Sequence, residues 1–471
     1  MSLPSTWTSP VGVAMRLVLW EPGGPPIPLL VGVVLLELAP APTHGQEASP
    51  RPHNEWSAPT RVDVPYGYVP VSLAARGDRA VLMSTLPTPL RTASSDSIRR
   101  ALPDHPNPSA LADRPPHVIQ RVGGPTMDLP GGTYGFAQPE MTISADGTLH
   151  MVWAAPPPTS SAADSERTRY TRLLYTARKD DQWTAVREIF SAPERGLRSP
   201  GEINWGDGRH SSLLLGPENA LHLSVITNAN HIHYLRRDAE GWSVVRTGAV
   251  DDEEVRMSVY ADLAVGTEGE HLVLPFVGPA GERDRNSVFV TRSVDGGETW
   301  STASPVHAPD ARVATMPEIS VDSSNQWHLA WLQSRGRGVF DGTPYFAVSP
   351  DAGTTWSEPS EIDVSSTGTS RSVVGAVHAA VGARGTVHMT FDRFGSDSDG
   401  IYHVRRTPTG WTAPHRLSTD GVDVRALEQT IGGLNRVHLA WLQVQGTPSE
   451  DRWPRPEQIE VLYLRQDGSH Q

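Results

Sequence analysis

The sequence contains no cysteine among its 471 residues. Disulfide bonds, thiolate metal sites, a cysteine nucleophile and a lipoprotein anchor are therefore excluded. Basic residues are also in deficit, with 40 Lys and Arg against 53 Asp and Glu and a formal net charge of -13. Because phosphates are held by an excess of Lys and Arg, this balance argues against a nucleic acid or an anionic membrane as partner.

Long stretches free of chain breakers are scarce, since the sequence carries 42 Gly and 42 Pro. This frequency argues against long helices, and the short Val, Leu and Trp runs between the breakers predict many short strands. The chain is also longer than one hydrophobic core normally fills. We therefore expect either several domains or a modular ring whose core is distributed.

Residues 27–38 (IPLLVGVVLLEL) are the one strongly apolar segment. Their length suits the core of a signal peptide and is too short to span a bilayer, which takes roughly 20 helical residues. Met15 and Arg16 offer a basic start, and Thr43 to Gly45 offer small residues for cleavage. The sequence thus predicts a leader over 1–45, a mature chain over 46–471, a secreted or periplasmic location, and no membrane span after leader removal. A disordered Pro-rich leader is the alternative.

From residue 66 onward a unit of four strands repeats at intervals of roughly 50 to 70 residues, a period typical of propellers and solenoids. The second strand of each unit starts at a His marker, and a seventh copy has Val81 instead. The markers are His150, His222, His271, His328, His388 and His438. The fourth strand starts at a tryptophan in five units, at Trp183, Trp242, Trp300, Trp356 and Trp411. We name the strands a to d in chain order; radial repetition of such units makes a β-propeller.

The two ends of the chain predict how the ring closes. The last unit stops after a strand c (VLYLRQDGSHQ), whereas residues 56–62 (WSAPTRV) read as an unpartnered strand d. Pairing them would complete the last blade and remove exposed sheet edges. The sequence therefore predicts an all-β fold, a propeller of seven four-stranded blades closed by an N-terminal strand. Six blades are the alternative if residues 66–130 do not form one.

Two adjacent units share the pattern Ser-x-Asp-x-Gly-x-Thr-Trp at the turn between strands c and d. The shared residues are Ser293, Asp295, Gly297 and Trp300 in SVDGGETW, and Ser349, Asp351, Gly353 and Trp356 in SPDAGTTW. In such a turn the carboxylate can accept backbone N–H bonds, the glycine supplies positive φ, and the tryptophan fills the space between sheets. We therefore expect these residues to be structural.

These two motifs resemble the Asp boxes of the sialidase-like (BNR-repeat) propellers, and the chain is similar to secreted bacterial members over residues 54–471. In that superfamily the boxes lie on the face away from the active site. The resemblance therefore implies a ligand site at the opposite rim, where strands a begin and the variable b–c loops project.

Four successive units carry an arginine just ahead of strand a, namely Arg256, Arg312, Arg371 and Arg425. Sialidases bind the substrate carboxylate with three arginines from different blades, and a guanidinium fork matches a carboxylate bidentately. The resemblance thus implies a substrate-binding role for these four. The alternative is that they pair with local acids such as Glu253, Asp310 or Asp423.

Carboxylates recur at a constant offset before the markers, as Glu140, Glu318 and Glu428. Glycoside hydrolysis needs an acid/base carboxyl and a nucleophile, and sialidases use a tyrosine as the nucleophile. The catalytic candidates are therefore Glu140, Glu318, Tyr134 and Asp392. The Arg-Ile-Pro signature of sialidases is absent, because Tyr68, Val69 and Pro70 stand at that place.

Two functions remain open at this stage. The first is a secreted propeller that binds a glycan or a protein at the rim without catalysis. The alternative is an exo-acting, sialidase-like glycoside hydrolase on an acidic sugar. Neither requires a cofactor or a metal, and His231 and His233 offer two imidazoles on one strand face without a third ligand placed by spacing.

Overall fold

The structure, a computed structural model, describes residues 56–64, 69–77, 79–85, 117–122, 126–127, 137–155, 172–192, 211–227, 231–239, 241–247, 260–279, 286–307, 313–334, 342–364, 373–382, 385–394, 399–419, 422–431, 436–445 and 458–466. By their contacts, residues His53–Gln471 form one compact unit. Within the described part of the chain, no helix is long and apolar enough to cross a membrane.

The described residues are almost entirely β-strands, with one 3-10 turn at Pro217–Asn219. The strands are β1 Thr60–Val62, β2 Val69–Arg76, β3 Arg79–Thr85, β4 His117–Arg121, β5 Thr126–Met127, β6 Ala137–Ile143, β7 Leu149–Ala155, β8 Arg172–Lys179, β9 Gln182–Trp183, β10 Arg187–Ser191, β11 Ser211–Leu215, β12 Leu221–Ile226, β13 Ile232–Arg237, β14 Trp242–Arg246, β15 Ala264–Val265, β16 Leu272–Pro279, β17 Asn286–Ser293, β18 Ser304–His307, β19 Val313–Val321, β20 Trp327–Ser334, β21 Gly342–Ser349, β22 Ser360–Glu361, β23 Val373–Val381, β24 Val387–Phe394, β25 Gly400–Thr407, β26 Gly410–Trp411, β27 His415–Arg416, β28 Val422–Ile431, β29 Val437–Gln445 and β30 Ile459–Arg465.

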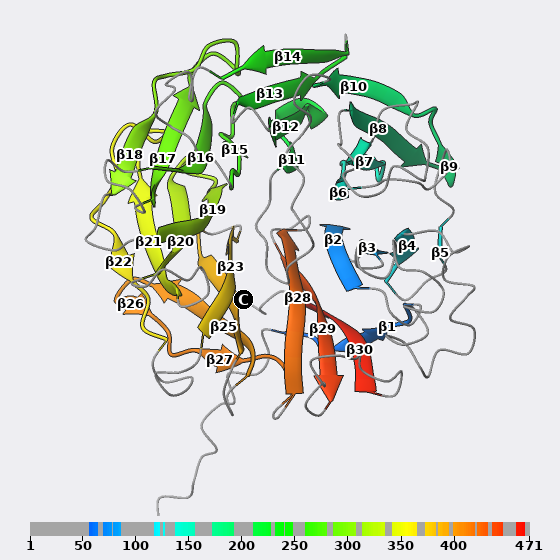
Figure 1. The fold of residues 1–471 in the computed structure, drawn as a ribbon, viewed down its shortest axis with the longest axis vertical. Helices are drawn as coiled ribbons and strands as arrows, with labels where there is room; N and C mark the ends of the chain where they lie inside the picture. Colours follow the sequence, from blue (N-terminus) through cyan, green and yellow to red (C-terminus); the bar gives the residue numbers. More distant parts are fainter. Residues whose placement is uncertain are drawn as a thin grey trace, which may run out of the picture. The chain divides into compact units, whose positions relative to one another are not determined.

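These strands form seven blades, which confirms the predicted propeller and its blade count (Figure 1). In chain order, blades 1 to 6 have β2, β6, β11, β15, β19 and β23 as strand a, and blade 7 has β28. Successive strands of a blade pair antiparallel from a to d. Strand β2 contacts both β6 and β28, so the first and last blades are neighbours.

The N-terminal strand β1 completes blade 7 by pairing antiparallel with β30, with Thr60 opposite Tyr463. Beyond β1, Trp56 forms a further antiparallel bridge to Gln466. The predicted closure by residues 56–62 is therefore confirmed. It gives β30, the c strand of blade 7, a partner along its outer edge.

The hydrophobic core is distributed over seven clusters, one for each contact between neighbouring blades. Each b strand lies between two strands of its own blade and between two neighbouring blades. Strand β20 is accordingly buried along its whole length, whereas the outer strand β10 contains only exposed and half-buried residues. This is why b strands read as continuous apolar runs in the sequence.

The His marker makes one recurring contact with the c strand of its own blade. In blades 2, 3 and 7 the marker Nδ1 lies 2.9, 2.6 and 2.6 Å from a tyrosine hydroxyl. The pairs are His150 with Tyr175, His222 with Tyr234, and His438 with Tyr463. Each tyrosine stands two residues before the c-strand residue that faces the marker.

The other blades fill the same two positions differently. In blade 6 the pair is His388 and His403. In blade 5 Phe346 stacks on His328 and cannot bond to it, and Asp322 Oδ2 instead lies 3.2 Å from His328 Nε2. Blades 1 and 4 carry buried apolar pairs, Val81 with Ile119 and Val273 with Val290.

The sequence predicts that His271 is one of the six His markers, and this prediction is wrong. His271 precedes β16 and is exposed, whereas Val273 occupies the marker position opposite Arg292. The cause is one extra residue in the a–b turn of blade 4. There the Gly266 N–H bonds to the His271 carbonyl, while in blade 5 the corresponding bond joins Asp322 to Gln326.

Tryptophans at the start of the d strands or shortly before them join neighbouring blades. Trp242, Trp300, Trp411 and Trp56 each meet, edge to face, the c-strand ring of the preceding blade, on Tyr175, Tyr234, Phe346 and His403 respectively. The centroid distances are 5.3, 5.3, 5.1 and 5.0 Å. The marker, the c-strand ring and the next tryptophan thus form one repeated packing unit, because T-shaped aromatic pairs are favourable.

Candidate functional site

Both Asp boxes are closed by hydrogen bonds within their own turn. Ser293 Oγ donates to Asp295 Oδ1 (2.7 Å) and accepts from the Gly297 N–H (2.8 Å). The Asp295 carboxylate also accepts from the hydroxyl and the N–H of Thr299, and these bonds lower the pKa of Asp295 to about 2. The second box repeats this network with Ser349, Asp351, Gly353 and Thr355.

The box glycines sit where two blades meet. Gly297 has φ +95°, and a Cβ there would lie 2.0 Å from the ring of Tyr234 in the preceding blade. The indole N–H of Trp300 donates to the Gly297 carbonyl (3.2 Å). The first box is therefore a joint between blades 3 and 4, with its carboxylate engaged in the turn.

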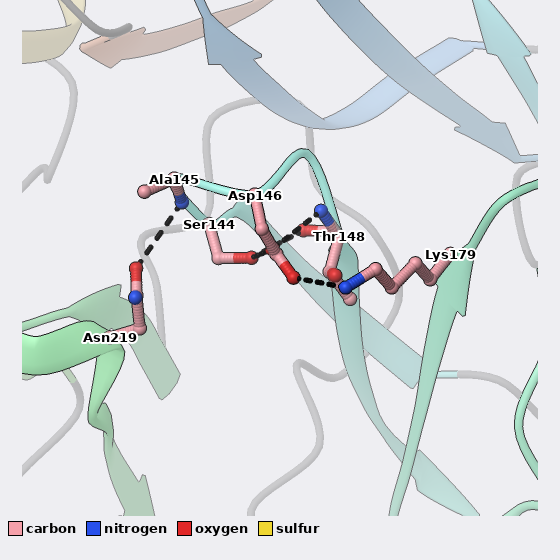
Figure 2. A network of polar contacts seen from close by, with 6 residues as sticks. All are labelled: Ser144, Ala145, Asp146, Thr148, Lys179 and Asn219. Atoms are coloured by element: carbon pink, nitrogen blue, oxygen red, sulfur yellow. Dashed lines mark hydrogen bonds and ion pairs between the residues drawn. The ribbon is translucent and has the colours of Figure 1, made fainter.

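The a–b turns lie at the same end of the sheets as the Asp boxes and are joined from blade to blade. Figure 2 shows the Ala145 N–H of blade 2 donating to Asn219 Oδ1 of blade 3 (3.2 Å). Blade 4 donates likewise from the Thr267 N–H to Asn325 Oδ1 of blade 5 (2.9 Å). Asn219 and Asn325 have φ +61° and +59°, a left-handed conformation that asparagine tolerates.

Asp146 organises the blade 2 turn that Figure 2 shows. It accepts from Ser144 Oγ (2.6 Å) and the Thr148 N–H (3.1 Å), and Lys179 Nζ lies 2.7 Å from its other oxygen. The Lys179 contact, followed by the Ser144 and Thr148 bonds, holds the pKa of Asp146 well below its usual value. At this end of the sheets the described polar groups are thus used to hold turns together.

The a strands carry a polar residue at one shared register position, opposite the second residue after the marker position. The set is Ser72, Glu140, Ser212, Asp262, Glu318, His378 and Glu428 in blades 1 to 7. Three of the sequence-predicted glutamates belong to this set. Asp262 and His378 were missed, Asp262 because the misplaced marker His271 shifts its offset by one residue.

Two members of this set connect neighbouring blades. Glu318 Oε2 accepts from the Ala379 N–H (2.9 Å), and Oε1 lies 2.7 Å from His378 Nδ1. Asp262 Oδ2 accepts from the Ile319 N–H (2.9 Å) at the preceding interface. Strand a is an edge strand with unpaired N–H groups, so these carboxylates satisfy donors on the next blade.

Asp392 and Arg393 lie in the last three residues of β24, strand b of blade 6, at the sheet end that leads into the b–c connections. Both are buried, with 7% and 4% of their surface exposed. Arg393 Nη1 donates to the Val364 carbonyl of blade 5 (2.8 Å), and burial lowers the pKa of Arg393. Asp392 is therefore a buried carboxylate that directly precedes a buried arginine in the sequence.

The other sequence-predicted residues are described in part or not at all. Tyr134, Arg256, Arg312 and Arg371 lie outside the described residues. Arg425 belongs to β28 and faces Leu442. Glu140, Glu318 and Glu428 occupy the same register position on their a strands, whereas Asp392 belongs to a b strand. The binding role of the arginines stays a prediction.

Within the described ranges, no three His, Asp or Glu side chains are arranged to hold a metal ion. The His231 and His233 rings lie 6.4 Å apart, centroid to centroid. The carboxylates at the shared a-strand position can accept hydrogen bonds. Glu318 and Asp262 already use this capacity between blades.

No protein-family model matches the chain, and no curated protein matches its sequence. Among solved structures, the polysaccharide lyase PL25 ulvan lyase bound to GlcA(1-4)Rha3S has a TM-score of 0.51 at 10% identity, over 86% of this chain and 94% of the lyase. At this identity the likeness shows the fold alone.

Two further structures align less well. A protein of unknown function from Dyadobacter fermentans has a TM-score of 0.46 at 15% identity, over 71% of this chain and 95% of its own. The α-L-arabinofuranosidase of Fusarium graminearum has 0.42 at 12%, over 72% and 95%. Both scores are too low to add to the fold assignment.

Proposed function

We propose that this chain is a secreted, sialidase-like propeller that binds a glycan at the sheet end opposite the Asp boxes, without catalysis. The observation that carries the proposal is the contrast between the two ends of the sheets. At the Asp-box end, short turns such as 144–148 and 322–326 are hydrogen-bonded within themselves or to the next blade. At the other end, longer connections such as 86–116, 156–171 and 446–458 join b to c strands.

Long connections on a rigid scaffold are where binding residues concentrate. The joined turns at the Asp-box end give the propeller that rigidity. The polar residues at the shared register position of the a strands, called the polar belt from here on, add fixed carboxylates between the blades, as the Glu318 contacts illustrate. The contrast between a rigid end with joined turns and an end with long connections supports a ligand site at the end with the long connections.

The arginines favour an acidic glycan. In the sequence, Arg256, Arg312 and Arg371 precede an a strand and Arg425 belongs to one, and guanidinium groups hold carboxylates and sulfates by paired hydrogen bonds. The ulvan lyase, which has the same fold, is bound to a polysaccharide that contains a uronic acid and a sulfate. A polyanionic sugar therefore fits better than a neutral one.

One observation favours the alternative, a glycoside hydrolase. Strands β6, β19 and β28 each bulge immediately before the glutamate of the polar belt, at Glu140, Glu318 and Glu428. Bulges often re-aim side chains beside active sites. However, a general acid needs a proton to give, and Glu318 has both oxygens engaged, one as acceptor of a main-chain N–H and one with His378. Glu318 is therefore a poor candidate for the general acid.

The test combines binding and turnover on the full-length chain. Acidic and neutral oligosaccharides are titrated by calorimetry, and fluorogenic sialosides and uronic-acid glycosides are assayed for hydrolysis. We expect acidic glycans to bind without turnover, and Arg312→Ala to weaken binding at least tenfold. The matched control is Arg61→Ala, which removes one exposed guanidinium from β1. Turnover lost in Arg312→Ala would establish the hydrolase instead, and a folded chain that binds no glycan would refute both.

A further inference from the structure

The closing contact of the ring ends on a pair of buried histidines. Trp56, which precedes β1, packs edge-on against His403 of blade 6 at 5.0 Å. Gln466, its bridge partner after β30, places Nε2 3.3 Å from His388 Nε2. Because the chain has no cysteine, no covalent bond secures this junction. Both residues of the closing bridge, Trp56 and Gln466, therefore contact histidines of blade 6.

His388 and His403 form a hydrogen-bonded, stacked pair. His388 Nδ1 lies 3.1 Å from His403 Nε2, and the rings are 5.3 Å apart with an interplanar angle of 15°. A hydrogen bond between two imidazoles needs one nitrogen without a proton. The contact is therefore lost when both rings are protonated, and two cations would then face each other in the core.

Other blades with a histidine marker place beside it a group that can accept a hydrogen bond from the protonated ring. In blades 2, 3 and 7 the partner is a tyrosine hydroxyl, which can accept a bond from a histidinium. In blade 5 the carboxylate of Asp322 faces the marker. Around the blade 6 pair the charged neighbours are Arg405 and His415, both basic, together with the neutral Gln466. In blade 6, protonation of both imidazoles therefore places two positive charges next to each other.

We propose that the His388–His403 pair is an acid-sensitive latch on the ring closure: protonation of the pair releases Trp56 and β1 and opens the seam between blades 6 and 7. The blades away from the seam stay folded in the opened form. Above the usual histidine pKa the pair is neutral and the ring is closed. The latch therefore responds to acid compartments or acid surroundings rather than to a ligand.

The pH window follows from the protonation equilibria. Burial, and next the charge of Arg405, lower the pKa of His388 from 6.5 to about 4, and burial lowers the pKa of His403 well below 6.5. In the opened form both groups return toward 6.5. The opened form then binds more protons, so closure loses stability as pH falls from 6.5 toward 4. For His388 alone, the opening equilibrium should rise about 30-fold between pH 8 and pH 5.

Hydrogen exchange on the full-length chain tests this latch. Protection factors, corrected for the intrinsic exchange rate at each pH, are measured by mass spectrometry at pH 8 and pH 5. We expect peptides covering β1 and β30 to lose at least tenfold in protection at pH 5, while those covering β19 and β20 lose less. His403→Tyr, which recreates the pair of blades 2, 3 and 7 beside its tryptophan, removes the second imidazole and should reduce the loss at β1.

Two further variants make the result decisive. The double variant His388→Val with His403→Ile recreates the apolar pair of blade 1 and should also remove the acid response, in case His403→Tyr folds poorly. His222→Val removes a marker far from the closure in the chain and should leave the response at β1 intact. The proposal is overturned if wild-type β1 keeps its protection at pH 5, or if His403→Tyr loses as much as the wild type.

Discussion

The box glycine Gly297 offers a sharp test of the joint between blades 3 and 4, through the substitution Gly297→Ala. A Cβ on Gly297 would lie 2.0 Å from Tyr234 Cε1, so the tyrosine ring must move. Its hydroxyl lies 2.6 Å from His222 Nδ1 and donates to the Gly296 carbonyl at 3.3 Å. Displacing the ring therefore disturbs the packing unit of blade 3 as well as the box itself.

The magnitude is the sum of three effects. Positive φ costs an alanine about 1–2 kcal/mol, overpacking adds about 1–3 kcal/mol, and a buried imidazole nitrogen left without a partner adds about 1–3 kcal/mol. We therefore expect the free energy of unfolding to fall by roughly 3–8 kcal/mol, a large share of a typical total of about 5–15 kcal/mol. Gly353→Ala should lose less, because its Cβ would lie 3.2 Å from the methyl groups of Val273.

Gly77→Ala is the matched control. Gly77 has φ +58° but nothing within 4 Å of an added Cβ, so only the backbone cost remains. We expect about 1 kcal/mol there. The assay is the urea midpoint of each variant at pH 7, followed by far-UV circular dichroism, with m-values compared to exclude a changed unfolding transition. If Gly297→Ala loses no more than Gly77→Ala, the box does not make the inter-blade contact described.

Two further predictions concern the marker pairs. Tyr234→Phe leaves His222 Nδ1 without its hydroxyl partner and should lower the free energy of unfolding by about 1–3 kcal/mol. The control Tyr345→Phe removes a 3.3 Å contact to the exposed Glu361 and should change the free energy of unfolding by less than about 0.5 kcal/mol. Equal urea midpoints for the two variants would contradict this prediction. Burial, and next Arg236, lower the pKa of His222 to about 4, so the unfolded state binds more protons below pH 6.5 and stability falls as pH drops from 6.5 to 4. His222→Val should therefore reduce the loss of unfolding free energy between pH 7 and pH 4 by about 3 kcal/mol, and an unchanged loss in urea titrations would show that His222 does not contribute.

The propeller and its closure could be predicted because short, local sequence patterns indicate both. A marker at the start of strand b and a tryptophan at the start of strand d recur at regular intervals, and Trp56 without a preceding c strand indicates a missing partner. The marker at His271 failed because one extra turn residue moves a histidine out of register. Nothing local distinguishes the exposed His271 from the buried His328, since both precede an apolar run.

The contacts between blades were beyond the reach of the sequence. Asp262 binds the N–H of Ile319, and Glu318 that of Ala379, and both bonds require the relative placement of two blades. The pairing of His388 with His403 likewise depends on the strand register, which places the partner two residues before the facing residue. Glu318 could be recognised as recurrent, but its use as a connector between blades could not.

The closure by β1 has a consequence for the order of folding. The Arg465 N–H bonds to Ser57 Oγ, a contact between residues separated by 408 positions. The cost of joining distant segments must be met before such a contact forms, so it forms late. During synthesis the residues of β1 emerge first, yet their partner strand emerges last. The first strand of the propeller to leave the ribosome is therefore the last to pair, and the ring cannot close until β30 has been synthesised.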